Sequence, residues 1–227
     1  MVKEIHPLTT NNIYRQYFER FYDFTNASKY KLIRRPGVFI YGLFPTEGST
    51  SINNISFPLR SLGDIQKEGI NVKDYVIKFN APNHITEYTL CFVFYLWRNR
   101  IFTLNKKNTS NGSNLLKLKY DKTNNKLSLT SGSSTDNITI PSDSNGKRIV
   151  VWLAENFSSN VTKVKISSYR SAISIPAVQY SNAQNFRFTS EDRVLNKIML
   201  SKNFYDIDSD QYHRVMIQEK LNGSYIR

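Results

Sequence analysis

The stretch LKLKYDKTNNKLSLT, residues 116–130, indicates the fold of this chain most directly. Apolar and polar residues alternate on both sides of segment 121–125, which is rich in Asp, Asn and Thr. Two alternating runs joined by turn-forming residues predict a β-hairpin, with one face of each strand buried. The predicted core residues are Leu116, Leu118, Leu127 and Leu129. The residues predicted to point into solvent are Lys117, Lys119 and Lys126.

Short runs of strand-forming residues, bounded by turn residues, continue along most of the chain. Two of them, 90–97 and 149–153, are apolar at nearly every position, which predicts central strands covered on both faces. We therefore predict an all-β fold, a two-sheet antiparallel β-sandwich of the jelly-roll kind. The predicted strands are 38–44, 55–61, 75–80, 87–97, 101–104, 115–120, 126–130, 137–140, 148–154, 161–167, 172–178, 185–189 and 194–201.

A short amphipathic helix is predicted near the N-terminus, within residues 8–24. Thr and Asn residues there can cap a helix, and aromatic residues follow at helical spacing. These aromatic residues are Tyr14, Phe18, Phe21 and Tyr22. We expect residues 1–35 to form an arm that packs on the domain or on a neighbouring molecule, and residues 36–227 to form a single sandwich domain.

A second short helix is predicted at 210–221, near the C-terminus. Asp208 or Ser209 can cap its start, and Asn222-Gly223 can end it. One side of this helix should pack at an edge of the sandwich. The residues on that side are Tyr212, Val215, Met216 and Glu219.

The composition is that of a globular protein that needs neither disulfides nor metals to build its core. The chain has 227 residues, of which 40% are hydrophobic, with 14 Tyr and 14 Phe. Its one cysteine, Cys91, lies in an apolar run and should be a small buried hydrophobe. Residues 1–7 do not resemble a signal peptide, and no apolar run approaches the roughly 20 residues of a membrane span. We expect a soluble protein made in the cytosol, without a transmembrane segment.

A formal charge of +13 favours acidic partners such as sulfated or sialylated glycans, nucleic acid or an anionic membrane surface. The basic residues are concentrated in 98–126, where eight of them accompany the single acid Asp121. Two interpretations remain open. This region either binds an anionic ligand, or its lysines keep exposed strand edges from pairing with other chains.

The order of elements from about 57 to 227 resembles the laminin-G-like and concanavalin A-like lectin sandwiches. YTLCFVFYLW (88–97) is similar to an early core strand of these lectins, and 114–129 is similar to the hairpin that follows it. GKRIVVWLAEN (146–156) and VTKVKISSY (161–169) are similar to their later paired strands. The resemblance implies recognition of glycans or proteins. A viral jelly-roll coat or spike protein would show a comparable series of strands.

The sequence offers no recognisable catalytic or cofactor-binding motif, so we expect no enzymatic activity and no cofactor. Glu191-Asp192 would point to opposite faces of a strand, whereas glycoside hydrolysis needs two facing carboxylates. The acids of 206–210 resemble the start of a calcium loop, but Gln211 replaces its turn glycine and Ile217 its final glutamate, so helix capping is their expected role. The three histidines, His6, His84 and His213, are far apart in the sequence, so a zinc site would need residues brought together by the fold.

The favoured function is noncatalytic recognition or assembly, with a glycan or protein as ligand. The chain could also be a structural or attachment subunit of a virion or other large particle. In that case it would form a homo-oligomer or a larger assembly. The alternative is nucleic-acid binding through phosphate contacts, to which Lys163 and Lys165 would contribute, although no nucleic-acid-binding motif is present. The candidate ligand-binding residues are Trp97, Arg98, Asn99, Arg100, Lys106, Lys107, Lys117 and Lys119.

Overall fold

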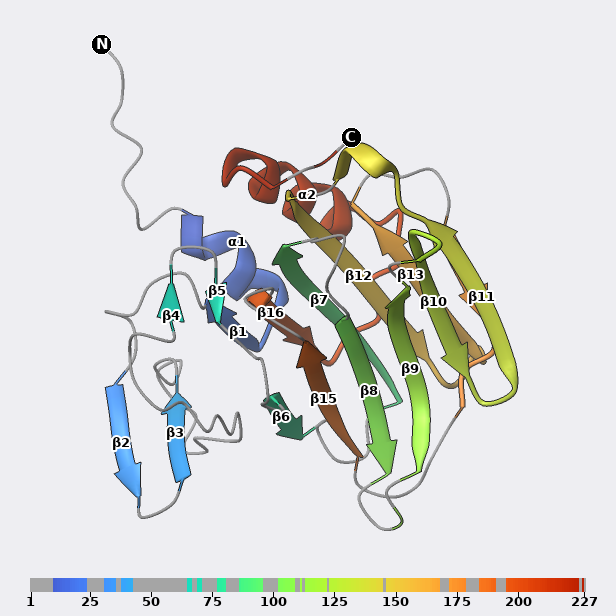
Figure 1. Cartoon of the computed structure of the whole chain (residues 1–227), viewed down its shortest axis with the longest axis horizontal. Helices are drawn as coiled ribbons and strands as arrows, with labels where there is room; N and C mark the ends of the chain where they lie inside the picture. Colours follow the sequence, from blue (N-terminus) through green and yellow to red (C-terminus); the bar gives the residue numbers. More distant parts are fainter. Residues whose placement is uncertain are drawn as a thin grey trace.

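Two antiparallel β-sheets lie face to face in this protein, and two helices lie beside one of them (Figure 1). The computed structural model describes residues 10–23, 31–35, 38–42, 65–66, 69–70, 77–80, 86–95, 102–108, 111, 113–121, 123–144, 146–167, 172–178, 184–190, 195–224 and 226. The predicted strand 55–61 falls outside these residues.

The larger sheet, here sheet A, has eight strands, and β7 and β12 lie near its middle. Every pairing in it is antiparallel, and β1 joins it by pairing with β16. Its strands in spatial order are β14 (Ala172–Ile175), β13 (Val161–Ile166), β12 (Arg148–Asn156), β7 (Glu87–Tyr95), β16 (Leu195–Ser201), β5 (Gly69–Ile70) and β4 (Ile65–Gln66), with β1 (Arg20–Asp23) beside β16.

The second sheet, sheet B, has six antiparallel strands. They are β11 (Ser134–Thr139), β10 (Lys126–Ser131), β9 (Asn114–Asp121), β8 (Phe102–Asn108), β15 (Gln184–Ser190) and β6 (Ile77–Asn80). A separate hairpin pairs β2 (Lys31–Arg35) with β3 (Val38–Gly42), and a 3-10 turn, η3 (Ser142–Ser144), precedes β12. The predicted two-sheet antiparallel sandwich is therefore confirmed.

The hairpin of β9 and β10 shows why the alternating sequence forms these strands. Leu118 pairs with Leu129 across the hairpin, and Lys119 pairs with Ser128. The four predicted leucines are at most 1% exposed, whereas Lys117, Lys119 and Lys126 are exposed, as predicted. The connecting turn is closed by Asp121, whose carboxylate accepts a hydrogen bond from the Thr123 amide at 2.9 Å.

Sheet A is covered on both faces, which explains its continuous apolar strands. In β12, Ile149, Val151 and Leu153 enter the core between the sheets. Val150, Trp152 and Ala154 enter a second core on the opposite face of the sheet. Trp152 is fully buried there, and its indole N–H donates to the Tyr205 carbonyl at 2.9 Å.

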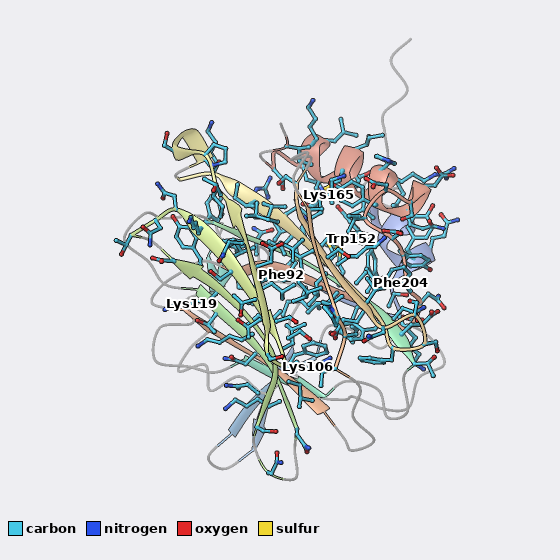
Figure 2. All side chains as sticks on the ribbon, turned by 90° about the vertical axis from the view of Figure 1, so that its right-hand side faces the viewer. Phe92, Lys106, Lys119, Trp152, Lys165 and Phe204 are labelled. Carbon is cyan, nitrogen blue, oxygen red and sulfur yellow. The ribbon has the colours of Figure 1, made fainter. Side chains whose placement is uncertain are left out.

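The two helices cover this second face of sheet A. Figure 2 shows them on the side of Trp152, while Lys119 lies on the opposite side of the sandwich. The predicted C-terminal helix is confirmed as α2 (Asp210–Leu221), and Ser209 caps it by accepting from the Tyr212 amide. Within the part of the chain that the structure describes, no helix is long and apolar enough to cross a membrane.

The N-terminal helix is shorter than the prediction. It forms α1 (Thr10–Tyr17), and the next residues form strand β1, in which Phe21 and Tyr22 pair with β16. Pairing with β16 satisfies backbone groups that a longer helix would have bonded internally, so tertiary contacts override the helical spacing. The division into an arm, 1–35, and a domain, 36–227, remains a prediction.

Candidate functional site

The structure separates the predicted ligand-binding residues into three groups. Residues 97–100, which include Trp97 and both predicted arginines, lie outside the described residues. Lys107, Lys117 and Lys119 belong to the outward side of sheet B. Lys106 lies in the core between the sheets and is 0% exposed, so it is not part of this surface.

The outward side of sheet B is a polar surface built from strands β8 to β11, here called the lysine face. Most inward residues of these strands are apolar, with Lys106 as the charged exception, and the alternate positions face solvent. The lysine face consists of Thr103, Asn105, Lys107, Lys117, Lys119, Asp121, Lys126, Ser128, Thr130, Thr135, Asn137 and Thr139. The described part of this face therefore carries hydroxyls, amides and ammonium groups, with one carboxylate, that of Asp121, at the end of β9.

Two rows of side chains cross the lysine face. Lys119 lies between Thr103 and Ser128 in the register of the strands. Lys117 lies in the same way between Asn105 and Thr130. Directly opposed residues have Cβ atoms about 4.5–5.5 Å apart, so each ammonium group has neutral polar neighbours on both sides.

The edge of the lysine face is ordered by hydrogen bonds between strands. The Ser128 hydroxyl donates to the Asn137 side-chain oxygen at 2.5 Å, and the hydroxyls of Thr130 and Thr135 lie 3.0 Å apart. These bonds fix side-chain rotamers before a ligand binds, which lowers the entropic cost of binding.

The lysines at the centre of this face have no carboxylate partner among the described residues. No ion pair forms at Lys117 or Lys119 within the described part of the chain. Asp121, on the same strand, accepts hydrogen bonds from Asn124 and from the Thr123 amide. Those bonds, with a smaller contribution from the charge of Lys119, lower the pKa of Asp121. The face thus offers positive charge to an external anion.

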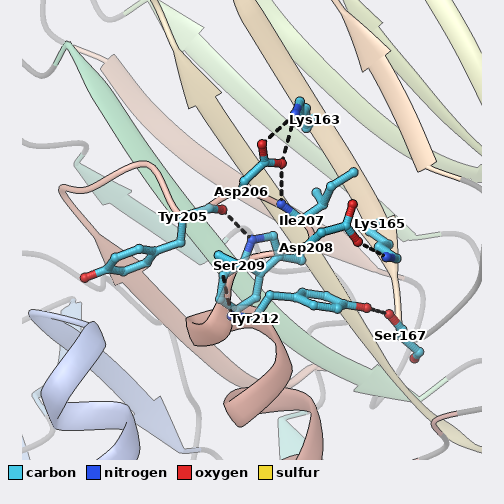
Figure 3. A network of polar contacts seen from close by, with 10 residues as sticks. Lys163, Lys165, Ser167, Tyr205, Asp206, Ile207, Asp208, Ser209 and Tyr212 are labelled. Carbon is cyan, nitrogen blue, oxygen red and sulfur yellow. Dashed lines mark hydrogen bonds and ion pairs between the residues drawn. The ribbon is translucent and has the colours of Figure 1, made fainter.

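The lysines of β13 present the opposite case (Figure 3). Lys163 contacts both carboxylate oxygens of Asp206, at 2.9 and 2.6 Å, and Lys165 contacts Asp208 at 2.6 Å. The hydrogen bond from Lys165 lowers the pKa of Asp208. Of the two predicted caps, Asp208 and Ser209, Ser209 caps the helix, whereas Asp206 and Asp208, whose expected role was capping, instead form ion pairs with the strand lysines.

Lys106 forms a buried polar cluster between the sheets. It makes an ion pair with Glu155, which also accepts hydrogen bonds from Tyr88 and from Thr162, the latter at 2.8 Å. Its ammonium lies 4.9 Å from the centre of the Phe157 ring. Burial, followed by the charge of Glu155, raises the pKa of Tyr88. The charge of Lys106 is satisfied inside the molecule and is unavailable to a ligand.

A second buried cluster joins the two helices to sheet A. Lys197 of β16 contacts Glu219 of α2 at 2.8 Å, and Tyr14 of α1 donates a hydrogen bond to the same carboxylate. Ser224 donates to the other oxygen of Glu219 at 3.0 Å. The sequence indicated that Glu219 shares the buried side of α2, but it gave no sign of these partners.

The described residues show neither a metal cluster nor a reactive thiol. No group of three His, Cys, Asp or Glu side chains among them is arranged to hold a metal ion. Cys91 is fully buried, and this burial raises the pKa of its thiol well above the ordinary value. Glu191-Asp192 lies outside the residues that the structure describes.

Comparison with known proteins gives structural neighbours only. The structure is similar to chicken galectin 2, with a TM-score of 0.41 and 10% sequence identity over 52% of this chain and 98% of that protein. It is similar to Xenopus laevis galectin-Ib, with a TM-score of 0.41 and 14% identity over 56% and 98% of the two chains. It is similar to a toad ovary galectin in complex with thio-digalactose, with a TM-score of 0.43 and 12% identity over 56% and 98%. No protein-family model and no curated protein sequence matches the chain.

Proposed function

We propose that this chain is a noncatalytic recognition module that binds an anionic glycan on the lysine face. The observation that carries the proposal is the exposure of Lys117 and Lys119 on the outward side of sheet B without a carboxylate partner among the described residues. Lys163 and Lys106, by contrast, are paired with acids.

The chemistry of the lysine face suits a sulfated or carboxylated sugar chain. Lys117 and Lys119 are two residues apart on one strand, so their attachment points are separated by about 6.7 Å. Charged groups on a ligand would meet the ammonium groups. Sugar hydroxyls would meet hydroxyl and amide side chains such as those of Ser128 and Asn137.

Nucleic acid is the weaker candidate ligand. Its binding was expected to draw on Lys163 and Lys165 as well, but both have carboxylate partners within hydrogen-bonding distance. Single-strand binders also stack bases on aromatic side chains. The described side chains of the lysine face include no aromatic ring. We also propose that the chain has a protein partner, and that it can serve as an attachment or structural subunit of a virion or other large particle.

The test is the affinity of the full chain for heparin and for a charge-matched single-stranded DNA, measured at several salt concentrations. Lys117→Gln with Lys119→Gln should weaken heparin binding about 10- to 100-fold, since each charge-assisted contact contributes about 1.5 kcal/mol. The matched control is Lys202→Gln with Lys220→Gln, which removes the same charge from exposed lysines outside the lysine face.

Equal losses in the two double variants would show that only net charge matters, and the proposed face would be wrong. A chain that binds the DNA tightly and heparin weakly would favour the nucleic-acid alternative. An uncharged glycan of the same length serves as the negative ligand, and we expect no measurable binding to it.

A further inference from the structure

A pocket of about 390 Å³ lies at one end of sheet A, away from the lysine face. Its lining residues come from β7, from the start of β12 and from the chain just after α2. They are Tyr95, Gly146, Lys147, Arg148, Gly223 and Ser224. This volume falls at the lower end of the range for small-molecule sites, so the pocket suits a small group rather than a long chain.

The local backbone explains how these residues meet. Arg148 and Tyr95 are directly opposite in the register of β12 and β7. The residues two positions inward from them, Val150 and Val93, face the helices, so by alternation Arg148 and Tyr95 belong to the helix side of sheet A. The end of α2 then passes beside this pair, where the Ser224 amide bonds the Glu219 carbonyl at 2.8 Å.

Glycine at 223 allows this close approach. Gly223 has a φ of +82°, in the left-handed region that disfavours other residues. A Cβ atom there would also lie 3.0 Å from Nη2 of Arg148. The guanidinium therefore lies directly against the chain that leaves α2.

Arg148 differs from Lys163, Lys165 and Lys197 because it has no acid partner among the described residues. The Arg148 residue is partly buried, yet its guanidinium forms no ion pair or hydrogen bond with any residue that the structure describes. Removing a cation from water without a counter-charge is unfavourable. The carbonyl end of α2 offsets only part of this cost. Lys147 adds a second positive charge to the lining.

We infer that this pocket binds a small oxyanion, a carboxylate, sulfate or phosphate group, with Arg148 as its principal contact. The flat guanidinium presents paired N–H donors that match two oxygens of such a group. The inference does not rest on the proposed function, because it concerns different residues on the other sheet.

The experiment is an NMR titration of the full chain with sodium sulfate, sodium phosphate and sodium acetate, at an ionic strength held constant with chloride. We expect backbone amide shifts that saturate at Gly146, Lys147, Gly223 and Ser224. The anion that saturates them at the lowest concentration identifies the oxyanion class. Shifts spread over all exposed lysines, without saturation at these amides, would overturn the inference.

The variant Arg148→Gln should weaken this binding at least tenfold. The control Lys202→Gln, which removes the same charge from an exposed site outside both proposed binding regions, should leave the affinity within about twofold. Equal weakening in Arg148→Gln and Lys202→Gln would overturn the inference. If Arg148→Gln does not fold, Arg148→Lys replaces it. That variant keeps the charge but loses the paired donors, so an affinity reduced about threefold or more supports the site and an unchanged affinity overturns it.

Discussion

Two strands of this protein carry the same short pattern, a lysine pair separated by one apolar residue. In β9 the pair is Lys117 and Lys119, and in β13 it is Lys163 and Lys165. The β13 lysines meet Asp206 and Asp208, which are 43 residues further along the chain. The β9 lysines meet no such acids in the described structure. The charges of the lysine pair are thus neutralised in β13 and not in β9. The difference arises because the segment before α2, distant in sequence, brings two acids to β13.

The difference extends to the faces that carry these pairs. The outward face of sheet A lies under α1 and α2 and contains a second apolar core. The outward face of sheet B is polar over β8 to β11. An extended recognition surface needs exposure and unpaired hydrogen-bonding groups, and the outward face of sheet B combines both at Lys117 and Lys119.

The largest expected difference between the two faces is in the rate at which a thiol on each of them reacts with a labelling reagent. Cys91 lies under the helices and is fully buried, so its modification requires opening of the fold. In a Cys91→Ala background, Lys117→Cys places a thiol on the lysine face. For a domain of ordinary stability we expect it to react roughly 10³-fold faster than Cys91 does in the wild-type chain. Labelling rates with a neutral thiol reagent measure this ratio. Similar rates would mean that the helices do not protect sheet A.

The next test separates a buried lysine from an exposed one. Lys106→Met leaves Glu155 uncompensated in the core, so it should lower the free energy of unfolding by about 3–5 kcal/mol. Adding Glu155→Gln should recover much of this loss, because the neutral amide no longer needs a counter-charge. Lys117→Met on the lysine face should change stability by no more than about 0.5 kcal/mol. Urea denaturation measures all three variants, and equal effects of the two lysine substitutions would contradict the assignment.

The smallest expected effect concerns the pH dependence of the β13 pairs. The hydrogen bond from Lys165 lowers the pKa of Asp208 in the folded chain. The pair therefore contributes fully to the free energy of unfolding above the unfolded-state pKa of about 3.9. This contribution is lost as the pH falls through the lower pKa of the folded state. Lys165→Met should move the pKa of Asp208, followed by carboxyl NMR, back toward its ordinary value. Because the Asp208 side chain is 69% exposed, the accompanying change in stability should be small. An unchanged pKa in the variant would show that the pair does not form in solution.

Local pattern was sufficient to predict much of the fold. Alternation located the hairpin of β9 and β10, and capping residues predicted the bounds of α2 correctly. These features depend on residues close together in sequence. The N-terminal helix was overextended because Phe21 and Tyr22 fit a helical spacing, while their position in β1 depends on pairing with β16, nearly 180 residues away.

The candidate site was less predictable for the same reason. Alternation indicated that Lys117 and Lys119 point outward, but it could not show that acids would leave them unpaired. The predicted strand ended at Leu104, whereas β8 continues to Asn108 and turns Lys106 inward. Its partner Glu155 is 49 residues away and gave no local signal. Arg148, in a predicted strand, was not identified as a binding residue, because its lack of a partner is visible only in three dimensions.

The helices make the two outer faces of the sandwich different, because they cover sheet A and leave sheet B open. Since α1 and α2 both lie on the outer side of sheet A, a molecule anchored through α2 would turn its lysines away from the support. Many copies held in this way on one surface would present their positive charges in a common direction, and such an array would engage a polyanion at several points at once. The arrangement of two short helices would then set the orientation of the whole layer.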